Sequence, residues 1–476
     1  MISELHNKLI NKEISAKELT DKFLCQIDNL NPQLNAFVNV TADKALETAD
    51  IVDRKIAGKE EIGVLSGIPM SLKDNISTKD TETSCCSEIL RGYIPPYDAT
   101  AWEKLKSQDA VLLGKANMDE FAMGCTGENS VFGAARNPHN NDYVAGGSSS
   151  GSAASVASGL AVYSLGSDTG GSVRQPAAFC GCFGLKPTYG AVSRYGLIAY
   201  ASSLDQIGIV AKSAEDTSLV FDNIAGFDPK DSTSCKRYVP CTFASLDNDI
   251  KGKRIGIPKE LFDKADTEIK DAVLRFAKGI GSLGADVEFF SMPQLIDALP
   301  SYYVIAFAEA SSNLGRFDGI RYSKRADSYE SIHEMVVKTR TELFGEVVKK
   351  RIITGTFVLS EGYYDKFYAK AQKVRRNLSC KFAEIFQKYD AILTATTEKT
   401  AFKLGETAED KESAFFADLC TVPANLAGIP ALSVPCGKSE KGLPIGVQLI
   451  ADKWQESLIL NIANKYEKTF GLGVEL

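Results

Sequence analysis

The amino-acid sequence predicts an α/β protein built in layers. Helical and strand-like segments are mixed along all 476 residues, with short connections between them. The 44% hydrophobic and 24% charged residues are ordinary proportions for a globular chain. Because no long polar linker or internal repeat divides the sequence, we expect one domain over residues 1–476. Within it we distinguish a helical region (1–60), a glycine- and serine-rich core (61–215) and a further αβ region (250–476).

Residues 1–60 are expected to be helical. Ser15 and Glu18 fit a capping box, and apolar residues follow them at helical spacing. We expect Asn31-Pro32 to end this helix, because a proline disfavours the helical conformation of the residue before it. A second helix is predicted from about Ala42 to Ile56, ending at Gly58.

Residues 61–215 alternate short apolar segments with turns rich in glycine, serine and asparagine. A small-residue helix is predicted between Gly151 and Gly159, and strands are predicted at Ile68–Leu72, Val111–Lys115 and Val162–Gly166. The glycine and serine content is also typical of a flexible linker. We disfavour that interpretation because apolar residues such as Val156 and Leu160 interrupt the polar run and require burial.

Residues 250–476 form a second series of strands and helices. The predicted strands are Arg254–Ile257, Asp286–Phe290, Ala391–Thr394 and Ala431–Pro435. A helix is predicted over Asp266–Leu283, and the segments Thr341–Arg351 and Tyr363–Tyr389 are predicted to be mostly helical.

Composition argues against several classes of function. The net charge of −7 disfavours direct phosphate binding as the main activity, although it allows docking to a partner that holds nucleic acid. No apolar run approaches the roughly 18 residues of a membrane span, and the N-terminus does not resemble a signal peptide. The 11 cysteines lack zinc-finger spacing. We therefore expect a cytoplasmic protein with free thiols and no metal, cofactor or membrane site.

Two serine loops and one lysine carry the predicted chemistry. The first serine loop is Gly146–Ala154, and the second is Asp168–Pro176. Lys73 directly follows the predicted apolar strand Ile68–Leu72. A serine becomes nucleophilic when a base accepts its proton, and a buried lysine can be neutral enough to act as that base. Ser148 could therefore pass a proton from Ser172 to Lys73.

The three histidines of the chain lie outside these segments, so the proposed relay uses no histidine. Other interpretations of the serine loops have less support. The second serine loop could bind phosphate, but the sequence lacks the P-loop pattern. Ser149 fits Gly-x-Ser-x-Gly, yet only His333 follows it as a base. Backbone N–H groups of Thr169, Gly170 and Gly171 could instead stabilise an oxyanion beside Ser172, because glycine allows close approach of a substrate.

These segments resemble the amidase signature family of serine hydrolases over essentially the whole chain. The matching segments are Gly67–Asn75, Gly114–Asn129, Gly146–Ala154, Asp168–Pro176 and Phe183–Thr188. The resemblance implies a mixed, twisted central sheet covered by helices on both faces. It also implies that Ser172 is the acyl-forming nucleophile, Ser148 the bridging serine after a cis peptide bond, and Lys73 the terminal base.

Further segments are similar to one branch of that family, the glutamine-hydrolysing subunits of amidotransferases that act on mischarged tRNA. They include Asn117–Gly124, Val192–Ile198, Ser202–Gly208, Glu309–Leu314, Arg316–Tyr322, Gly355–Ser360 and Pro423–Gly428. This resemblance implies glutamine as substrate and a heterotrimer with subunits B and C. It places ATP, magnesium and most contacts to the mischarged tRNA on the B subunit.

The same resemblance implies a pocket for the two charges of free glutamine. Arg351 would hold the α-carboxylate, since a guanidinium can bind a carboxylate through two hydrogen bonds. Asp418 would hold the α-ammonium, and either Tyr302 or Tyr303 would contact the substrate. Arg351 and Asp418 could instead be solvent-exposed helix residues. Asp168 and Arg174 are expected to tie the serine loops together, and Cys180 and Cys182 to be core residues.

The sequence departs from the family pattern at two places. Ser150 stands where glycine is common, and Thr394–Glu398 lacks prolines often found there. Two alternative functions remain at this point: a stand-alone amidase for another small amide, and a catalytically silent scaffold. The intact set of Lys73, Ser148 and Ser172 argues against the scaffold.

Overall fold

The computed structural model of the chain describes residues 1–237, 241–322, 324–406 and 417–474. One sheet of 11 strands runs through it in the order β1-β3-β2-β6-β8-β7-β12-β13-β11-β9-β10. Its strands are β1 (Phe37–Val40), β2 (Pro69–Lys73), β3 (Val111–Ala116), β6 (Tyr163–Asp168), β7 (Phe183–Lys186), β8 (Gln206–Ala211), β9 (Arg254–Pro258), β10 (Asp286–Phe290), β11 (Ala391–Ala395), β12 (Ala431–Lys438) and β13 (Pro444–Ala451). A separate pair is β4 (Arg136–Asn137) and β5 (Asn140–Val144).

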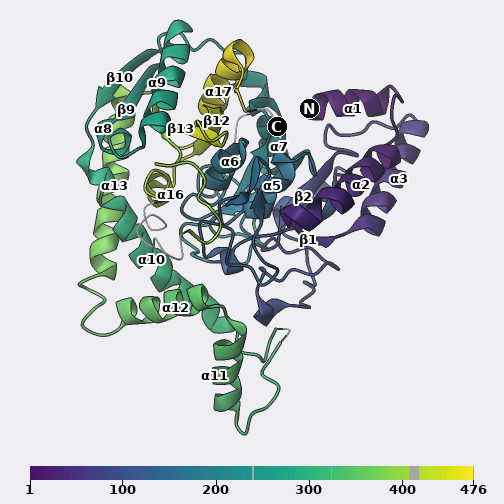
Figure 1. The fold of residues 1–476 in the computed structure, drawn as a ribbon, viewed down its shortest axis with the longest axis vertical. Coiled ribbons are helices and arrows are strands. Elements are labelled where there is room, and N and C mark those ends of the chain that lie inside the picture. Colours follow the sequence, from purple (N-terminus) through teal and green to yellow (C-terminus); the bar gives the residue numbers. More distant parts are fainter. Residues whose placement is uncertain (238–240, 323, 407–416, 475–476) are drawn as a thin grey trace.

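The sheet is mixed. Strand β2 pairs in parallel with β3 and β6, and β9 pairs in parallel with β10 and β11, whereas the strands in the middle of the sheet pair antiparallel. The pairing of β7 with β12 joins the core of residues 61–215 to the C-terminal region. The predicted α/β class with a mixed sheet and flanking helices is confirmed (Figure 1).

Helices surround this sheet (Figure 1). They are α1 (Ile2–Ile10), α2 (Ala16–Leu34), α3 (Ala42–Ala57), α4 (Thr100–Lys106), α5 (Ser150–Ala157), α6 (Arg174–Cys180), α7 (Ala214–Ile224), α8 (Lys259–Phe262), α9 (Thr267–Ser282), α10 (Ala298–Asn313), α11 (Ile332–Leu343), α12 (Glu346–Leu359), α13 (Tyr368–Lys388), α16 (Val422–Ala427) and α17 (Glu456–Phe470). Short 3₁₀ turns are η1 (Glu88–Leu90), η2 (Glu120–Ala122), η3 (Phe243–Ser245), η4 (Pro293–Leu295) and η5 (Leu314–Arg316).

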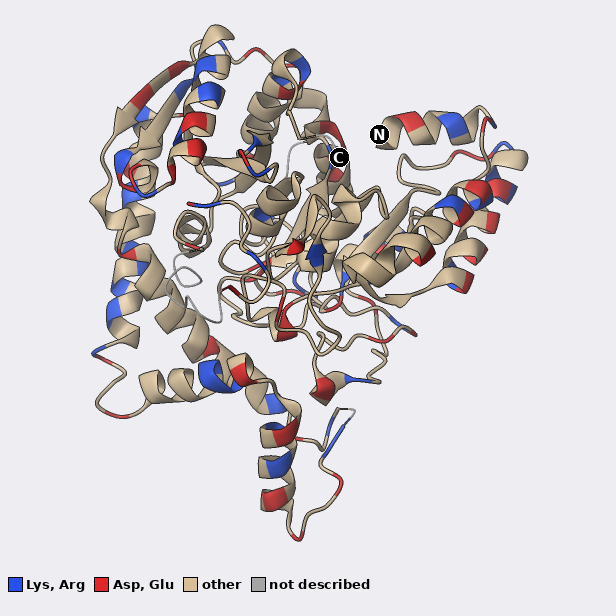
Figure 2. Ribbon diagram, viewed as in Figure 1, with Lys and Arg blue, Asp and Glu red and all other residues tan. Residues whose placement is uncertain are grey.

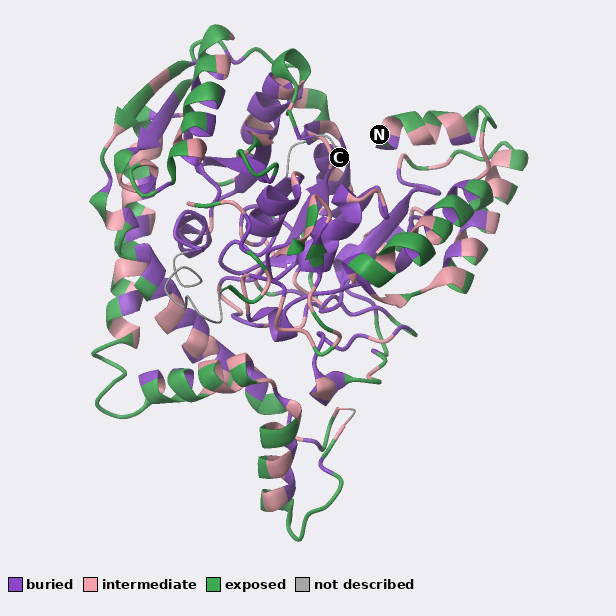
Figure 3. Cartoon of the chain, in the orientation of Figure 1, coloured by how far each residue is buried: buried purple, intermediate pink, exposed green. Residues whose placement is uncertain are grey.

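The core lies around the middle of the sheet. Every residue of α5, α6, β2, β6 and β8 is buried (Figure 3). Lys and Arg are interspersed with Asp and Glu on the outer helices, as along α11 (Figure 2). No helix in the described ranges is both long and apolar enough to cross a membrane.

The predicted end of the second helix at Asn31-Pro32 is wrong. Helix α2 continues through Pro32 to Leu34, where the Asn31 side chain pairs with both backbone groups of Phe37. The segment Thr341–Arg351 is mostly helical, as predicted, with a break at Phe344-Gly345 between α11 and α12. The segment Tyr363–Tyr389 is also mostly helical, as predicted, and α13 covers Tyr368–Lys388 of it.

The other predicted elements are close to those observed. The Ser15–Glu18 capping box is present, and α3 ends at Ala57, one residue before Gly58. The predicted strands match β2, β3, β6, β9, β10, β11 and β12 to within three residues at each end. The apolar patterns therefore located these elements to within a few residues. The wrong end, that of α2, lies where a side-chain contact with Phe37 follows the helix.

Candidate active site

Lys73, the last residue of β2, reaches the first serine loop in a fully buried contact. Its Nζ lies 2.7 Å from Ser148 Oγ and 2.9 Å from Ser149 Oγ, and it donates a 3.2 Å hydrogen bond to the Ser167 carbonyl. The Gly147–Ser148 peptide bond is cis, as the resemblance implies. The structure therefore brings together Lys73 and Ser148, which are 75 residues apart in sequence.

Ser172 lies beside this pair, at the start of the turn into α6. The Ser149 N–H donates to the Ser172 carbonyl at 3.0 Å, which joins the two serine loops. Ser172 is 7% exposed, whereas Lys73 and Ser148 are 0% exposed. Ser172 is thus the most exposed of the three side chains, and among the described residues no hydrogen bond joins its hydroxyl to that of Ser148.

The surroundings of Lys73 favour its neutral form. Burial lowers the pKa of Lys73 from 10.5 to about 7, although the carboxylates of Asp119, Asp168 and Asp205 act in the opposite direction. A lysine with this pKa exchanges its proton near neutral pH, as a general base must. The contact to Ser148 is short enough for proton transfer along the hydrogen bond.

A buried ion pair braces the second serine loop. Arg174 donates from Nε and Nη2 to the two carboxylate oxygens of Asp168, at 3.0 and 2.9 Å, and both side chains are fully buried. Burial alone would raise the pKa of Asp168, but the Arg174 guanidinium outweighs it and holds that pKa well below its usual range. Arg174 also donates to the Thr421 carbonyl and to the side chains of Gln448 and Asn425.

The turn from Asp168 to Ser172 differs from the predicted oxyanion site in one respect. The N–H of Gly171 donates to Asp168 Oδ1 at 2.9 Å and is therefore occupied. The backbone N–H groups of Thr169, Gly170 and Ser172 donate to no acceptor in the described residues. Gly171 has a φ of +136°, and a Cβ there would lie 2.3 Å from Thr421 Oγ1, so this position requires glycine. Two predicted donors, Thr169 and Gly170, thus remain available, together with Ser172.

Arg351 and Asp418 come from distant elements, α12 and the segment before α16. Arg351 donates from Nη1 to the Tyr200 phenol at 2.8 Å, and its guanidinium lies over the rings of Tyr200 and Phe307. Asp418 is 9% exposed, and burial raises its pKa to about 7 against the opposing effect of Arg351. No ion pair within 4.0 Å links these two side chains among the residues described. Neither is a solvent-exposed helix residue.

Tyr302 and Tyr303, both on α10, connect this charged pair to the serine loops. The Tyr303 hydroxyl donates to Asp418 Oδ2 at 3.5 Å. The Tyr302 ring packs on the second serine loop, where a Cβ at Gly170 would lie 2.4 Å from Tyr302 Cζ. Both tyrosines therefore border the candidate site, Tyr303 at Asp418 and Tyr302 at the second serine loop.

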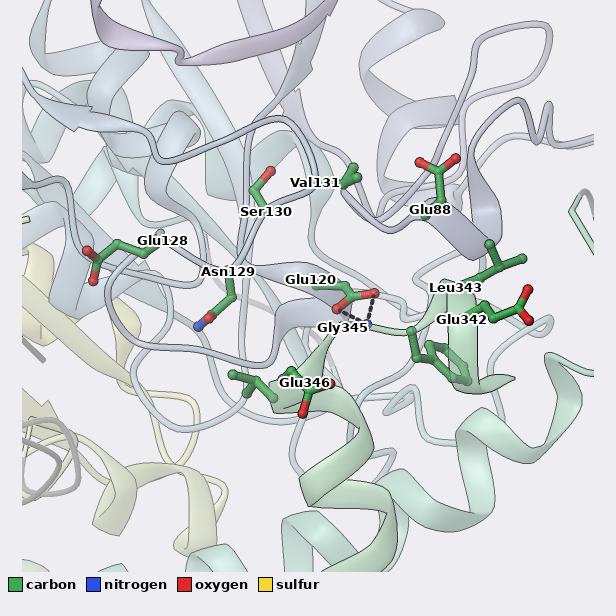
Figure 4. A pocket seen from close by; sticks show the side chains of 12 residues that line it. Glu88, Glu120, Glu128, Asn129, Ser130, Val131, Glu342, Leu343, Gly345 and Glu346 are labelled. Carbon is green, nitrogen blue, oxygen red and sulfur yellow. Dashed lines mark hydrogen bonds between the residues drawn. The ribbon is translucent and has the colours of Figure 1, made fainter. Parts of the chain in front are cut away.

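Helix α12 is fixed at its start by the Glu120 carboxylate, which accepts the Gly345 N–H with both oxygens, at 3.2 and 3.0 Å. Figure 4 shows this contact in a hollow between η2 and α12, together with other glutamates. Phe344 next to it packs against Phe121. These contacts set the position from which Arg351 extends.

Several site residues were not predicted from the sequence. Ser149 is a second partner of Lys73, Tyr200 is the partner of Arg351, and Thr421 donates to the Gly170 carbonyl at 2.6 Å. Ser149 lies in the predicted first serine loop, so the loop motif could have identified it. No local sequence pattern distinguishes Tyr200 or Thr421. Cys180 and Cys182 are buried free thiols, as predicted. Among the described residues no group of His, Cys, Asp or Glu is arranged to hold a metal ion.

A model of the amidase family, described as Amidase, matches residues 18–460, and the chain belongs to this family. It is 50% identical over 472 residues to the A subunit of glutamyl-tRNA(Gln) amidotransferase of Brevibacillus brevis, covering 99% of this chain and 96% of that protein. The corresponding protein of Trichormus variabilis is 50% identical over 472 residues, covering 98% and 97%. The crystal structure of the A subunit of glutamyl-tRNA(Gln) amidotransferase from Thermotoga maritima is 40% identical, with a TM-score of 0.80 and coverage of 95% and 92%.

Proposed function

We propose that this chain hydrolyses the side-chain amide of glutamine to glutamate and ammonia, as the glutaminase component of a tRNA-dependent amidotransferase. The observation that carries the proposal is the buried 2.7 Å contact of Lys73 with Ser148. Near the second serine loop lie one basic side chain, Arg351, and one acidic side chain, Asp418, which interact electrostatically. Binding of free glutamine, with its α-carboxylate and α-ammonium, needs both charges, and binding of a simple amide needs neither.

In the acylation step, Ser172 Oγ attacks the amide carbon and forms a C–O bond. Ser148 takes the proton of Ser172 and passes its own to neutral Lys73. The relay then returns a proton to the amide nitrogen as the C–N bond breaks, so that ammonia leaves and a γ-glutamyl ester remains on Ser172. In the second step water attacks the ester, the relay removes its proton, and glutamate leaves as Ser172 is reprotonated.

The oxyanion of each tetrahedral intermediate is stabilised by the N–H groups of Thr169, Gly170 and Ser172. Their freedom from other acceptors in the described chain supports this assignment, and we assign Gly171 a structural part instead. A single preorganised donor of this kind contributes about 3 kcal/mol to transition-state stabilisation. The hydrogen bond of Gly171 to Asp168 and its close packing against Thr421 hold the turn in one conformation.

Glutamine is held by its two charges. Arg351 binds the α-carboxylate, Asp418 binds the α-ammonium, and Tyr303 orients Asp418 through its hydroxyl. Tyr302 borders the side-chain amide, because it packs on Gly170. Both tyrosines, rather than one of the two, are thus assigned to the pocket.

We assign the reaction that consumes the ammonia to a partner subunit. The two sequence relatives and the Thermotoga maritima structure are all named as the A subunit of glutamyl-tRNA(Gln) amidotransferase, which supports assembly of this chain with subunits B and C in a cytoplasmic heterotrimer. We assign ATP, magnesium and the mischarged tRNA, Glu-tRNA(Gln) or Asp-tRNA(Asn), to the B subunit. The stand-alone amidase has less support, since the similarity to these relatives covers nearly the whole chain.

Ammonia release from glutamine tests the proposal. The chain should release ammonia in complex with subunits B and C, and mischarged tRNA with ATP should stimulate it. Ser172→Ala should abolish release, because the relay has no nucleophile to activate, and size-exclusion chromatography should show unchanged assembly. Normal turnover by Ser172→Ala would refute the mechanism, whereas cleavage of simple amides with glutamine untouched would favour the stand-alone amidase.

A further inference from the structure

Tyr200 lies under the guanidinium of Arg351 and is almost completely buried, with 1% of its surface exposed. Its phenol oxygen accepts a 2.8 Å hydrogen bond from Arg351 Nη1, and its ring faces the Arg351 guanidinium carbon at 5.4 Å. The phenol therefore uses an oxygen lone pair toward Arg351. Its own O–H hydrogen has to point elsewhere.

That hydrogen has no acceptor within residues 1–237, 241–322, 324–406 and 417–474. A buried hydroxyl donor without an acceptor is unusual, because leaving it unpaired costs free energy that water would otherwise recover. A phenol beside a guanidinium is also a stronger donor, since the cation withdraws electron density from the oxygen. An anionic acceptor bound by Arg351 would satisfy this donor.

The backbone around Tyr200 fixes the phenol in this position. The Tyr200 N–H donates to Asp205 Oδ2 at 2.9 Å, and the Tyr200 carbonyl accepts from Asn313 Nδ2 at 3.1 Å. Asp205 Oδ1 accepts the Thr169 hydroxyl at 2.6 Å, so one carboxylate connects Tyr200 to the second serine loop. Preorganised donors of this kind lose little entropy when a ligand arrives.

We propose that Tyr200 is a substrate-binding residue that donates its phenol O–H to the α-carboxylate held by Arg351, and that it sets specificity for a free carboxylate. This inference rests on the proposed function and extends its substrate pocket. Two donors on one carboxylate, a guanidinium and a phenol, distinguish free glutamine from a glutamine residue inside a peptide, whose carboxylate has become an amide. The alternative is that Tyr200 only supports Arg351 through its ring.

The test compares two substrates of the wild-type complex and of its Tyr200→Phe variant. L-Glutamine has the α-carboxylate, and L-glutaminamide replaces it by a neutral amide while keeping the α-ammonium and the side-chain amide. Phenylalanine keeps the ring under Arg351 and removes only the hydroxyl. The matched control is Tyr189→Phe, which removes a part-buried hydroxyl that donates to the Ser202 carbonyl at 2.7 Å, away from Arg351.

We expect Tyr200→Phe to lower kcat/KM for glutamine by about 10- to 100-fold through KM, with kcat nearly unchanged. Its kcat/KM for glutaminamide should stay within about twofold of wild type, because no carboxylate is present to lose a donor. Tyr189→Phe should change the ratio for the two substrates by less than about twofold. Calorimetric titration of glutamine into the Ser172→Ala and the Ser172→Ala/Tyr200→Phe complexes should show the same loss of affinity.

Equal losses on both substrates, or no loss on either, would overturn the assignment and leave Tyr200 as a ring that supports Arg351. If the wild-type complex hydrolyses neither substrate, the proposed function itself fails and the Tyr200 assignment fails with it. If the wild-type complex hydrolyses both substrates with equal kcat/KM, the carboxylate is not recognised. The assignment of Arg351 is then also refuted, while the serine mechanism stands.

Discussion

The pH dependence of amide hydrolysis tests the proposed roles of Lys73 and Asp418 together. A lysine with the ordinary pKa of 10.5 is neutral in roughly 0.03% of molecules at pH 7. Burial in this structure lowers the pKa of Lys73 to about 7, so about half of the molecules hold the neutral base. The fold therefore raises the concentration of active base by roughly three orders of magnitude.

Asp418 titrates in the same range but acts on a different step. Burial raises the pKa of Asp418 to about 7, and only its ionised form attracts the substrate ammonium. Between pH 6 and pH 8 the active fraction of each group rises about tenfold when its pKa is near 7. The kcat/KM for glutamine should therefore rise up to about 100-fold over this interval, because both groups must lose a proton.

The assay measures ammonia release by the complex from pH 5.5 to pH 8.5 with two substrates. Glutaramate, which is glutamine without its α-ammonium, does not need ionised Asp418, so its kcat/KM should rise only about tenfold between pH 6 and pH 8. Lys73→Arg is the control, since a guanidinium stays protonated throughout this range and cannot accept a proton. We expect that variant to be inactive on both substrates.

Two results would refute this reasoning. A kcat/KM for glutaramate that does not change between pH 6 and pH 8 would show that no base with a pKa near 7 limits the reaction, against the role of Lys73. Equally steep profiles for the two substrates would show that Asp418 does not bind the ammonium. Activity of Lys73→Arg would remove proton acceptance by residue 73 from the mechanism altogether.

Two further substitutions test the pocket and the buried ion pair. Arg351→Ala should raise the KM for glutamine by roughly 100-fold while the complex still assembles, because a charge-assisted contact to the carboxylate is lost; an unchanged KM would remove Arg351 from the pocket. Arg174→Met should lower the free energy of unfolding by about 3–5 kcal/mol, since it leaves the buried Asp168 unpaired. That loss, measured by urea denaturation, should be complete only above the raised pKa that burial gives Asp168 in the variant, and it should shrink as the pH falls toward the lowered pKa of Asp168 in the wild type. An equal loss at every pH would mean that packing, and not charge, is responsible.

The elements that local patterns define were predicted well from the sequence. Helix α3 follows from its apolar periodicity, and strands β2, β3 and β9 follow from short, largely apolar runs that are almost completely buried. The features that local patterns missed are helix ends that depend on residues outside the helix. Helix α2 passes Pro32 because Asn31 pairs with Phe37, and the break before α12 depends on Glu120, which is 225 residues from Gly345.

Local features of the sequence, its glycine-rich turns and short apolar strands, were enough to predict the α/β class, the two serine loops and the candidates Lys73, Ser148 and Ser172. The folded chain was needed to show that Lys73 is buried against Ser148 and Ser149, that the Gly171 N–H donates to Asp168, and that Arg351 donates to Tyr200. These contacts could not be predicted because proximity and burial depend on the order of strands in the sheet. The pKa of a buried base and the pairing of charges far apart in sequence follow from that order, and no local pattern encodes it.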